Sequence, residues 1–209
     1  MNEVRVARRD FLKCLPSGGV IAEIGVWRGI HGRDMWDLCS PASLYLVDPW
    51  QWNTQWHRTH YEGTVEHLAE DAMKITKERF EGCKEVSFVR KESGVAAQGF
   101  ENGFFDWVYI DGDHRFEEAK RDMEVWWPKI KPGGYLTGHD FLETVRENSL
   151  KTLNFPTEFE LRDNGVTKAL LGFMEDQSLT LAFLSKGINK PNGSQFSQCW
   201  AIKKNNDLH

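Results

Sequence analysis

Residues 104–141 constrain the fold more than any other stretch, because a buried strand, an amphipathic helix and a second buried strand follow one another there. The first strand is the apolar run Phe105–Ile110, which is typical of a parallel strand covered on both faces. Apolar residues then recur at helical spacing over Phe116–Trp127, and a proline-glycine turn leads into a second strand at Gly134–Thr137. The pattern predicts a right-handed βαβ unit with both strands in one parallel sheet.

Both predicted strands end in polar residues. Asp111 and His114 follow the first strand, and His139 and Asp140 follow the second. Neighbouring strands lie about 4.8 Å apart, so these side chains should open into one crevice at the carboxyl edge of the sheet. Ligands bind at that edge in open α/β sheets. The stretch therefore predicts a functional site rather than a simple core.

A second candidate site element lies near the start of the chain, where a strand at Val20–Ile24 leads through a glycine turn into a helix at Ile30–Leu38. Gly25 and Gly29 let the backbone approach a ligand closely, and the amino end of the helix favours negative charge. The alternative is that the two glycines only shape a tight turn between strand and helix. The turn alone does not choose between these interpretations.

An acidic residue follows the next predicted strand and narrows the choice. Ser43–Val47 ends at Asp48, a position from which a carboxylate can accept two hydrogen bonds from a ribose diol. The turn and the acid together indicate a ligand that contains a nucleoside. Trp27 stands where the dinucleotide fingerprint requires a second glycine, so a nicotinamide or flavin dinucleotide is disfavoured.

The remaining periodic segments complete one α/β domain over residues 1–209. We expect a mostly parallel seven-stranded sheet that ends in an antiparallel pair, with helices on both faces. The other predicted elements are an N-terminal helix within residues 1–18 (Val4–Leu15), a helix at Glu62–Phe80, a strand at Val86–Val89, a helix at Gly165–Asp176, and strands at Leu179–Leu184 and Cys199–Lys203.

Two insertions without clean periodicity border the predicted crevice. Residues 50–61 interleave aromatic residues and histidines with polar ones, and we interpret them either as a lid or as a tryptophan-rich patch that packs on the following helix. Residues 141–164 are polar and irregular, and with 50–61 they should select the substrate. Ser93 follows the third strand, where it would either cap a short helix or bind a ligand base, and capping is the commoner role.

Composition excludes several classes of partner. The net charge of −5 and the absence of a lysine or arginine run argue against nucleic acid, and no apolar stretch is long enough to cross a membrane. The N-terminus carries charges throughout and lacks a secretory signal pattern, so we expect a cytoplasmic protein. The four cysteines lie too far apart in sequence to indicate a zinc cluster or a disulfide framework.

Four motifs occur here in a fixed order: E-I-G-V-x-x-G, V-D-P-W, F-D-x-V-x-I-D-G-D-H and P-G-G-x-x-x-G-H-D. They cover Glu23–Gly29, Val47–Trp50, Phe105–His114 and Pro132–Asp140, with a weaker match at Gly165–Ala169. In these motifs the chain resembles class I S-adenosylmethionine-dependent methyltransferases, in particular the subgroup related to macrocin and other sugar O-methyltransferases. The resemblance implies a Rossmann-like methyltransferase fold and extends over most of residues 20–204.

The resemblance also assigns roles in cofactor binding. It implies that Glu23, Gly25 and Gly29 hold the methionine portion of S-adenosylmethionine, that Asp48 holds the ribose hydroxyls, and that Ser93 lies at the adenine end. The carboxylates of Glu23 and Asp111 suit the ammonium and the sulfonium. The cofactor has no pyrophosphate, so Trp27 is acceptable in the turn.

Methyl transfer to a hydroxyl needs a route for the proton, and the sequence offers two. One is a histidine base, His114 or His139; the other is a divalent metal, magnesium in related enzymes, held by Asp111 and Asp140. His139 stands where those relatives have aspartate, and imidazole is a poorer magnesium ligand. Structural alternatives are that His114 caps the following helix and that His139 bonds to backbone.

The leading expectation is O-methylation of a small-molecule acceptor. A binding protein that keeps the fold without catalysis and a metal-dependent hydroxylase are the alternatives. The sequence does not identify the acceptor. It also leaves the oligomeric state open, and a homo-oligomer is compatible with it.

Overall fold

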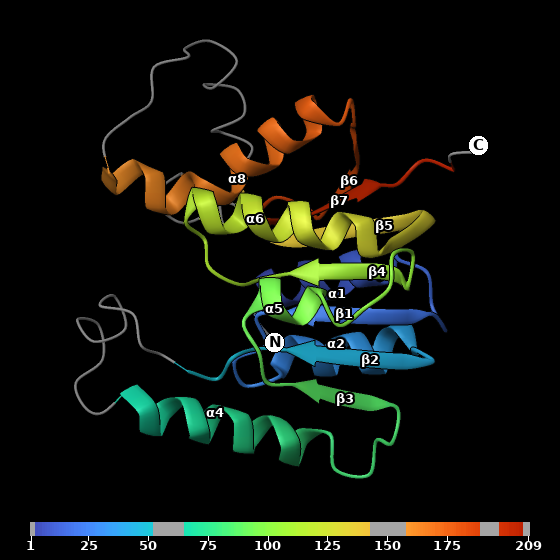
Figure 1. Ribbon diagram of the computed structural model, residues 1–209, viewed down its shortest axis with the longest axis vertical. Coiled ribbons are helices and arrows are strands. Elements are labelled where there is room, and N and C mark those ends of the chain that lie inside the picture. The colour runs from blue at the N-terminus through green and yellow to red at the C-terminus, as the bar shows by residue number, and fades with distance from the viewer. Residues whose placement is uncertain (1–2, 52–64, 143–157, 189–196, 207–209) are drawn as a thin grey trace.

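The computed structural model describes residues 3–51, 65–142, 158–188 and 197–206. Its centre is a seven-stranded sheet in the order β3-β2-β1-β4-β5-β7-β6 (Figure 1). The strands are β1 Val20–Ile24, β2 Ser43–Val47, β3 Val86–Val89, β4 Phe105–Ile110, β5 Ile130–Phe141, β6 Leu181–Leu184 and β7 Gln198–Lys203. β1 to β5 are parallel, and β7 runs antiparallel to both β5 and β6. The predicted fold class is confirmed.

Helices cover both faces of this sheet, as predicted. They are α1 Glu3–Leu12, α2 Ile30–Cys39, α4 Val65–Arg79, α5 Ser93–Ala97, α6 Phe116–Trp126, the 3-10 turn η1 Trp127–Lys129, and α8 Glu158–Asp176. One buried cluster joins the sheet to α1, α2 and α4, and the other joins it to α5, α6 and α8. Figure 1 shows α5 and α6 in front of the sheet and α1 and α2 behind it. None of the helices in the described ranges combines the length and apolarity needed to span a membrane.

The central strand β4 shows how the sequence supplies both cores. Trp107 and Tyr109 pack on the α1/α2 face, whereas Phe105 and Val108 pack on the α6/α8 face, and each is fully buried. Phe105 and Trp107 face opposite sides although they are two residues apart, because a register shift separates them in the β4/β5 pairing. Burial on both faces explains the continuous apolar run in the sequence.

The first four strands have the predicted bounds, but the bounds of several other elements differ. α1 ends at Leu12 rather than Leu15, and β5 begins at Ile130 rather than Gly134 because Ile130 already pairs with Phe105 of β4. α8 begins at Glu158, so residues 158–164, expected to be irregular, are helical. The good helix formers of that segment outweigh the breaking effect of Gly165. Most of the expected insertions, including 52–61 and 143–157, lies outside the described residues.

Candidate functional site

The carboxyl ends of β1, β2 and β4 meet at one place. Gly25 has φ +85°, and a Cβ atom there would lie 2.2 Å from the carbonyl oxygen of Asp111. Asp48 accepts hydrogen bonds from the backbone N–H groups of Val26 and Trp27 in the same turn. The glycine turn, Asp48 and Asp111 therefore converge as the sequence predicts. Gly25 is required both by its backbone conformation and by this close approach.

Asp48 stabilises the backbone of the glycine turn through hydrogen bonds. Its Oδ2 accepts from Val26 N and Trp27 N at 2.9 Å each, and its Oδ1 accepts from Trp50 N at 2.6 Å. Burial raises the pKa of Asp48, and the three N–H donors act in the opposite direction. The indole of Trp50 adds a bond from Nε1 to the Trp27 carbonyl at 2.9 Å. Three of the roughly four acceptor positions of the carboxylate are thereby used. The ribose contact remains a prediction.

Ser93 does not cap α5, so the capping prediction is wrong. Glu92 is the N-cap residue, without a side-chain cap bond. The Ser93 hydroxyl instead donates to Asp122 Oδ1 at 2.5 Å and accepts from Trp126 Nε1 at 2.9 Å. Ser93 is the first residue of α5 rather than its N-cap, and its hydroxyl is already engaged by these two side chains. Burial raises the pKa of the Asp122 carboxyl to about 6. Ser93 still lies beyond the end of β3, and contact with adenine stays a prediction.

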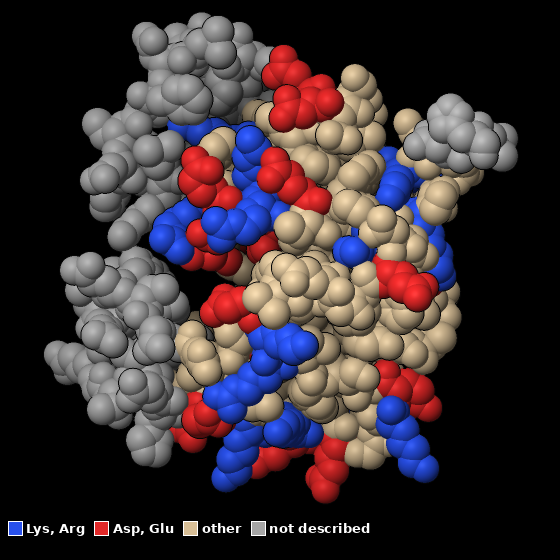
Figure 2. Space-filling view, viewed as in Figure 1, with Lys and Arg blue, Asp and Glu red and all other residues tan. Residues whose placement is uncertain are grey.

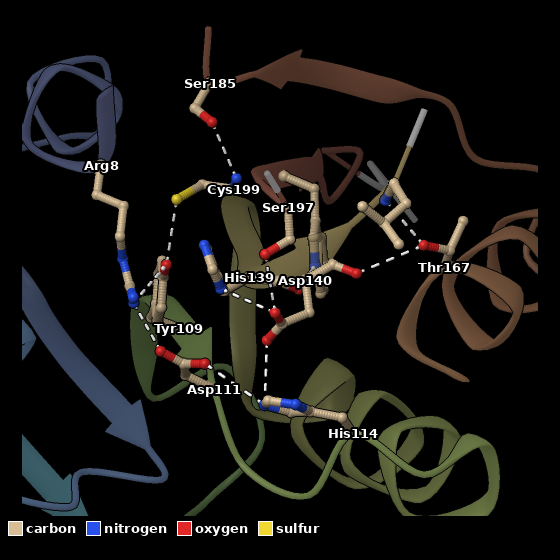
Figure 3. A network of polar contacts seen from close by, with 12 residues as sticks. Arg8, Tyr109, Asp111, His114, His139, Asp140, Thr167, Ser185, Ser197 and Cys199 are labelled. Atoms are coloured by element: carbon tan, nitrogen blue, oxygen red, sulfur yellow. Dashed lines mark hydrogen bonds and ion pairs between the residues drawn. The ribbon is translucent and has the colours of Figure 1, made fainter. Parts of the chain in front are cut away.

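Arg8 reaches the site from α1, which the sequence analysis did not anticipate. Its Nη2 lies 2.6 Å from Asp111 Oδ2 and 3.2 Å from the Tyr109 hydroxyl (Figure 3). Burial by itself would raise the pKa of Asp111, but Arg8 and His114 hold it well below its usual range. Asp111 is therefore a charged group with a cation already beside it. An arginine within a helix carries no sequence signal of such a distant partner.

Two further titratable side chains lie behind the glycine turn. Glu23 is 1% exposed, and a Cβ atom on Gly32 of α2 would come within 2.5 Å of its Oε2. Burial raises the pKa of Glu23 well above its usual value, and the charge of Asp111 adds to the shift. Burial and the nearby Arg8 lower the pKa of His31. Neither Glu23 Oε2 nor His31 Nε2 has a hydrogen-bond partner among the described residues.

The end of β5 is bent out of the ladder. The β5/β7 register shifts between Gly138 and Phe141, and Asp140 has φ +62°, a left-handed conformation that is uncommon for a residue with a side chain. His139 Nδ1 lies 3.2 Å from Asp140 Oδ1, which also accepts from Ser197 Oγ at 3.0 Å. Trp200 Nε1 donates to the His139 carbonyl at 2.9 Å. The bulge thus aims both predicted site residues at the sheet edge.

His114 bridges the two halves of the site. Its Nε2 lies 3.0 Å from Asp140 Oδ2 and 3.8 Å from Asp111 Oδ1, as Figure 3 shows. The N-cap of α6 is Arg115, without a side-chain cap bond, so His114 does not cap the helix. Asp111 and Asp140 raise the pKa of His114 to about 9. His114 is therefore an imidazolium at neutral pH.

Asp111, His139 and Asp140 each offer one atom, all within 4.8 Å of one another, so they fit a single ion. Two carboxylates and one imidazole form a donor set for Mn²⁺, Fe²⁺ or Zn²⁺ more than for Mg²⁺, which prefers oxygen ligands. Arg8 and His114 lie against the same carboxylates. A cation entering this set would have to compete with two side chains of the protein.

The weaker motif at residues 165–169 supports the site from α8. A Cβ atom on Gly165 would lie 2.2 Å from the His114 carbonyl, so a glycine lets α8 approach that loop. The hydroxyl of Thr167, fully buried, accepts from the Leu142 N–H at 2.9 Å. α8 thereby holds the backbone next to His114 and Asp140 in place.

With this geometry in view, comparison with known proteins identifies the family. The sequence model of a methyltransferase domain matches residues 22–141, more than half of the 209 residues. The chain belongs to this methyltransferase domain family. The matched part of the methyltransferase domain runs from β1 to the end of β5 and contains the glycine turn, Asp48, Asp111, His114, and the His139–Asp140 pair. No curated protein matches the sequence.

Solved structures share the fold of this methyltransferase domain at low identity. The N-methyltransferase NodS from Bradyrhizobium japonicum is 13% identical, with 98% of each chain covered and a TM-score of 0.60. The O-methyltransferase from Bacillus cereus, in complex with SAH, is 16% identical over 98% of this chain and 82% of its own, with a TM-score of 0.61. A Streptococcus mutans protein in complex with SAH is 13% identical over 98% of this chain and 99% of its own, with a TM-score of 0.61. These likenesses concern the fold.

Proposed function

We propose that the protein transfers a methyl group from S-adenosylmethionine to an oxygen of a small-molecule acceptor. The proposal rests on the convergence of the glycine turn, Asp48 and Asp111 beside a dense polar cluster, in a chain of the methyltransferase domain family. Neighbours of the same fold include proteins in complex with SAH, the product of such a transfer, and one of them is an O-methyltransferase.

The cofactor roles follow the order of the strands. The turn at Gly25–Gly29 with Glu23 would receive the methionine portion, Asp48 the ribose, and the region of Ser93 the adenine. Asp111 lies against the glycine turn and pairs with Arg8, and its carboxylate favours the positive charge of the donor. Holding nucleophile, methyl carbon and sulfur in line, and excluding water, supplies much of the acceleration.

For the acceptor proton we assign His139 as the base and Asp140 as the residue that orients it. An Nδ1–H group facing Asp140 Oδ1 at 3.2 Å leaves a lone pair on Nε2, an enclosed atom that has no partner in the described ranges. His114 is less suited because it already carries a proton at neutral pH. In the step the acceptor oxygen bonds to the methyl carbon, the carbon–sulfur bond breaks, and the hydroxyl proton passes to His139 Nε2. The products are a methyl ether and SAH.

A divalent ion is the second route for activating the acceptor. Asp111, His139 and Asp140 would hold it, and it would lower the pKa of the acceptor hydroxyl. The routes separate by experiment. A metal route predicts that added magnesium or manganese raises activity and that Asp140→Ala abolishes the increase. If activity is unchanged by a strong chelator but is lost in His139→Gln, the result supports His139 as the general base.

Surface charge favours a small acceptor over nucleic acid. Figure 2 shows acidic and basic side chains interspersed on the described part of one face, where the basic side chains do not form one continuous patch. The net charge of −5 points the same way. A small hydroxylated acceptor needs no such patch.

The direct test is calorimetry with SAH, followed by transfer from labelled methyl donor to hydroxyl and amine acceptors. We expect native protein to bind SAH, Asp48→Ala to bind it far more weakly, and only hydroxyl acceptors to be labelled. Native protein that does not bind SAH, or unaltered affinity in Asp48→Ala, removes the basis of the proposal. Binding without transfer to any acceptor favours a non-catalytic binding protein, and oxygen consumption without use of the methyl donor favours a hydroxylase.

A further inference from the structure

α1 delivers one charged side chain to the inside of the molecule. Phe11 and Leu12 are 2% and 0% exposed, and Arg8 lies three and four residues before them on the same helix face. Anchoring this face against the sheet therefore turns Arg8 inward, where its side chain is only 22% exposed. A guanidinium removed from water needs compensating partners. A position on the outer face of α1 would avoid this cost.

The hydrogen-bond partners of Arg8 occupy only some of its N–H donors. Nη2 donates to Asp111 Oδ2 and to the Tyr109 hydroxyl. Nε is enclosed and has no hydrogen-bond partner in the part of the chain that the structure describes. A guanidinium presents five N–H donors in a rigid fork that matches a carboxylate. Arg8 is thus desolvated and oriented, yet its fork is incompletely used.

The surroundings hold the fork in place. The Tyr109 hydroxyl lies 3.2 Å from Cys199 Sγ, and Cys199 N donates to Ser185 Oγ at 3.0 Å, so β4 and β7 fix the phenol (Figure 3). The guanidinium carbon lies 5.8 Å from the centre of the Tyr109 ring. These buried contacts make the position of Arg8 a property of the fold rather than of a free surface side chain.

Groups of both signs meet at this point. Asp111 is an anion beside the glycine turn, Arg8 is the cation that pairs with it, and the buried acid Glu23 is near enough to be influenced by both charges. An amino acid carries an ammonium and a carboxylate on one carbon, so it needs partners of both kinds. We propose that Arg8 binds the α-carboxylate of the methionine portion of the cofactor, which makes α1 a wall of the cofactor site. This inference rests on the proposed function, because it adds a contact to the same ligand.

The test compares two ligands that differ only in the carboxylate: SAH and its decarboxylated analogue, which keeps the ammonium. Calorimetry with native protein should show that SAH binds more tightly. Arg8→Gln should weaken SAH about 10-fold to 100-fold, the range for a lost charge-assisted hydrogen bond, and leave the analogue unchanged. The preference for SAH should therefore disappear in this variant.

Arg9→Gln is the matched control on the same helix. Arg9 pairs with Asp34, which keeps Arg5 as a partner at 2.9 Å, so this change should leave both affinities unaltered. If Arg8→Gln fails to fold, Arg8→Lys is the second variant, because it keeps a charge beside Asp111 but loses the forked guanidinium. It should reduce the ratio between the affinities for SAH and for the decarboxylated analogue.

Other outcomes overturn the inference. Equal losses for both ligands would mean that Arg8 only positions Asp111. An unchanged preference for SAH in a folded Arg8→Lys protein would also contradict it. Unaltered SAH affinity with a raised KM for the acceptor would assign Arg8 to a carboxylate of the acceptor instead. Native protein that binds neither ligand refutes the proposed function, and the inference falls with it.

Discussion

Asp122 should make the stability of this protein depend on pH in a way that one substitution removes. The residue is 7% exposed, and burial raises the pKa of its carboxyl from 3.8 to about 6. The folded protein therefore holds a proton that the unfolded chain has lost between these two values. A raised carboxyl pKa means that stability is highest below the unfolded pKa and falls as pH rises toward the folded pKa. The loss is complete only when the pH is well above the folded pKa.

The size of the effect follows from the shift. A difference of about 2 pKa units corresponds to about 3 kcal/mol in total, of which about 2 kcal/mol falls between about pH 4.5 and about pH 7.5. Asp122→Asn has no proton to lose and still offers an oxygen to the Ser93 hydroxyl. The variant should therefore gain about 2 kcal/mol relative to native protein over this interval.

Urea unfolding at several pH values measures this difference directly. Glu124→Gln is the control, because Glu124 lies on the same helix with its side chain 53% exposed, and its effect should change little with pH. Comparing each variant with native protein cancels the contributions of all other titrating groups. A free-energy difference between Asp122→Asn and native protein that stays constant with pH would refute the reasoning, as would one that decreases as pH rises.

Three more substitutions test the geometry. Gly25→Ala should abolish SAH binding in calorimetry, because the added Cβ would lie 2.2 Å from the Asp111 carbonyl; retained binding would contradict the close approach. Gly165→Ala should lower both the melting temperature and the transfer rate, since its Cβ would lie 2.2 Å from the His114 carbonyl. An unaltered transfer rate would mean that α8 does not influence the site. Phe105→Ala should cost about 3–5 kcal/mol in urea unfolding, because Phe105 is fully buried; a loss below about 1 kcal/mol would argue against a packed core there.

The features that were predicted correctly are those that depend on local patterns of residues in the sequence. The strands β1 to β4 are apolar runs with turn or loop residues beside them, and their bounds followed from that pattern alone. The meeting of Asp111 with His139 and Asp140 followed from one rule, that neighbouring parallel strands end at the same edge. The ladder between β4 and β5 bears this out.

Pairings between distant residues were not predictable in this way. Arg8 and Asp111 are 103 residues apart, and Ser93 and Asp122 are 29 apart. Each depends on how a helix is rotated against the sheet, which helical periodicity indicates only coarsely. The bulge at the end of β5 has no single sequence signal either, although it decides where His139 and Asp140 lie.

The family match begins at residue 22, whereas α1 ends at Leu12. Proteins compared only over the matched segment would look equivalent even where the cation facing Asp111 differs, because that cation comes from the preceding helix. A fragment trimmed to residues 22–141 would leave Asp111 without Arg8 and would also lack Ser197, which holds Asp140. The charge balance of the site is thus set partly from outside the segment that defines its family.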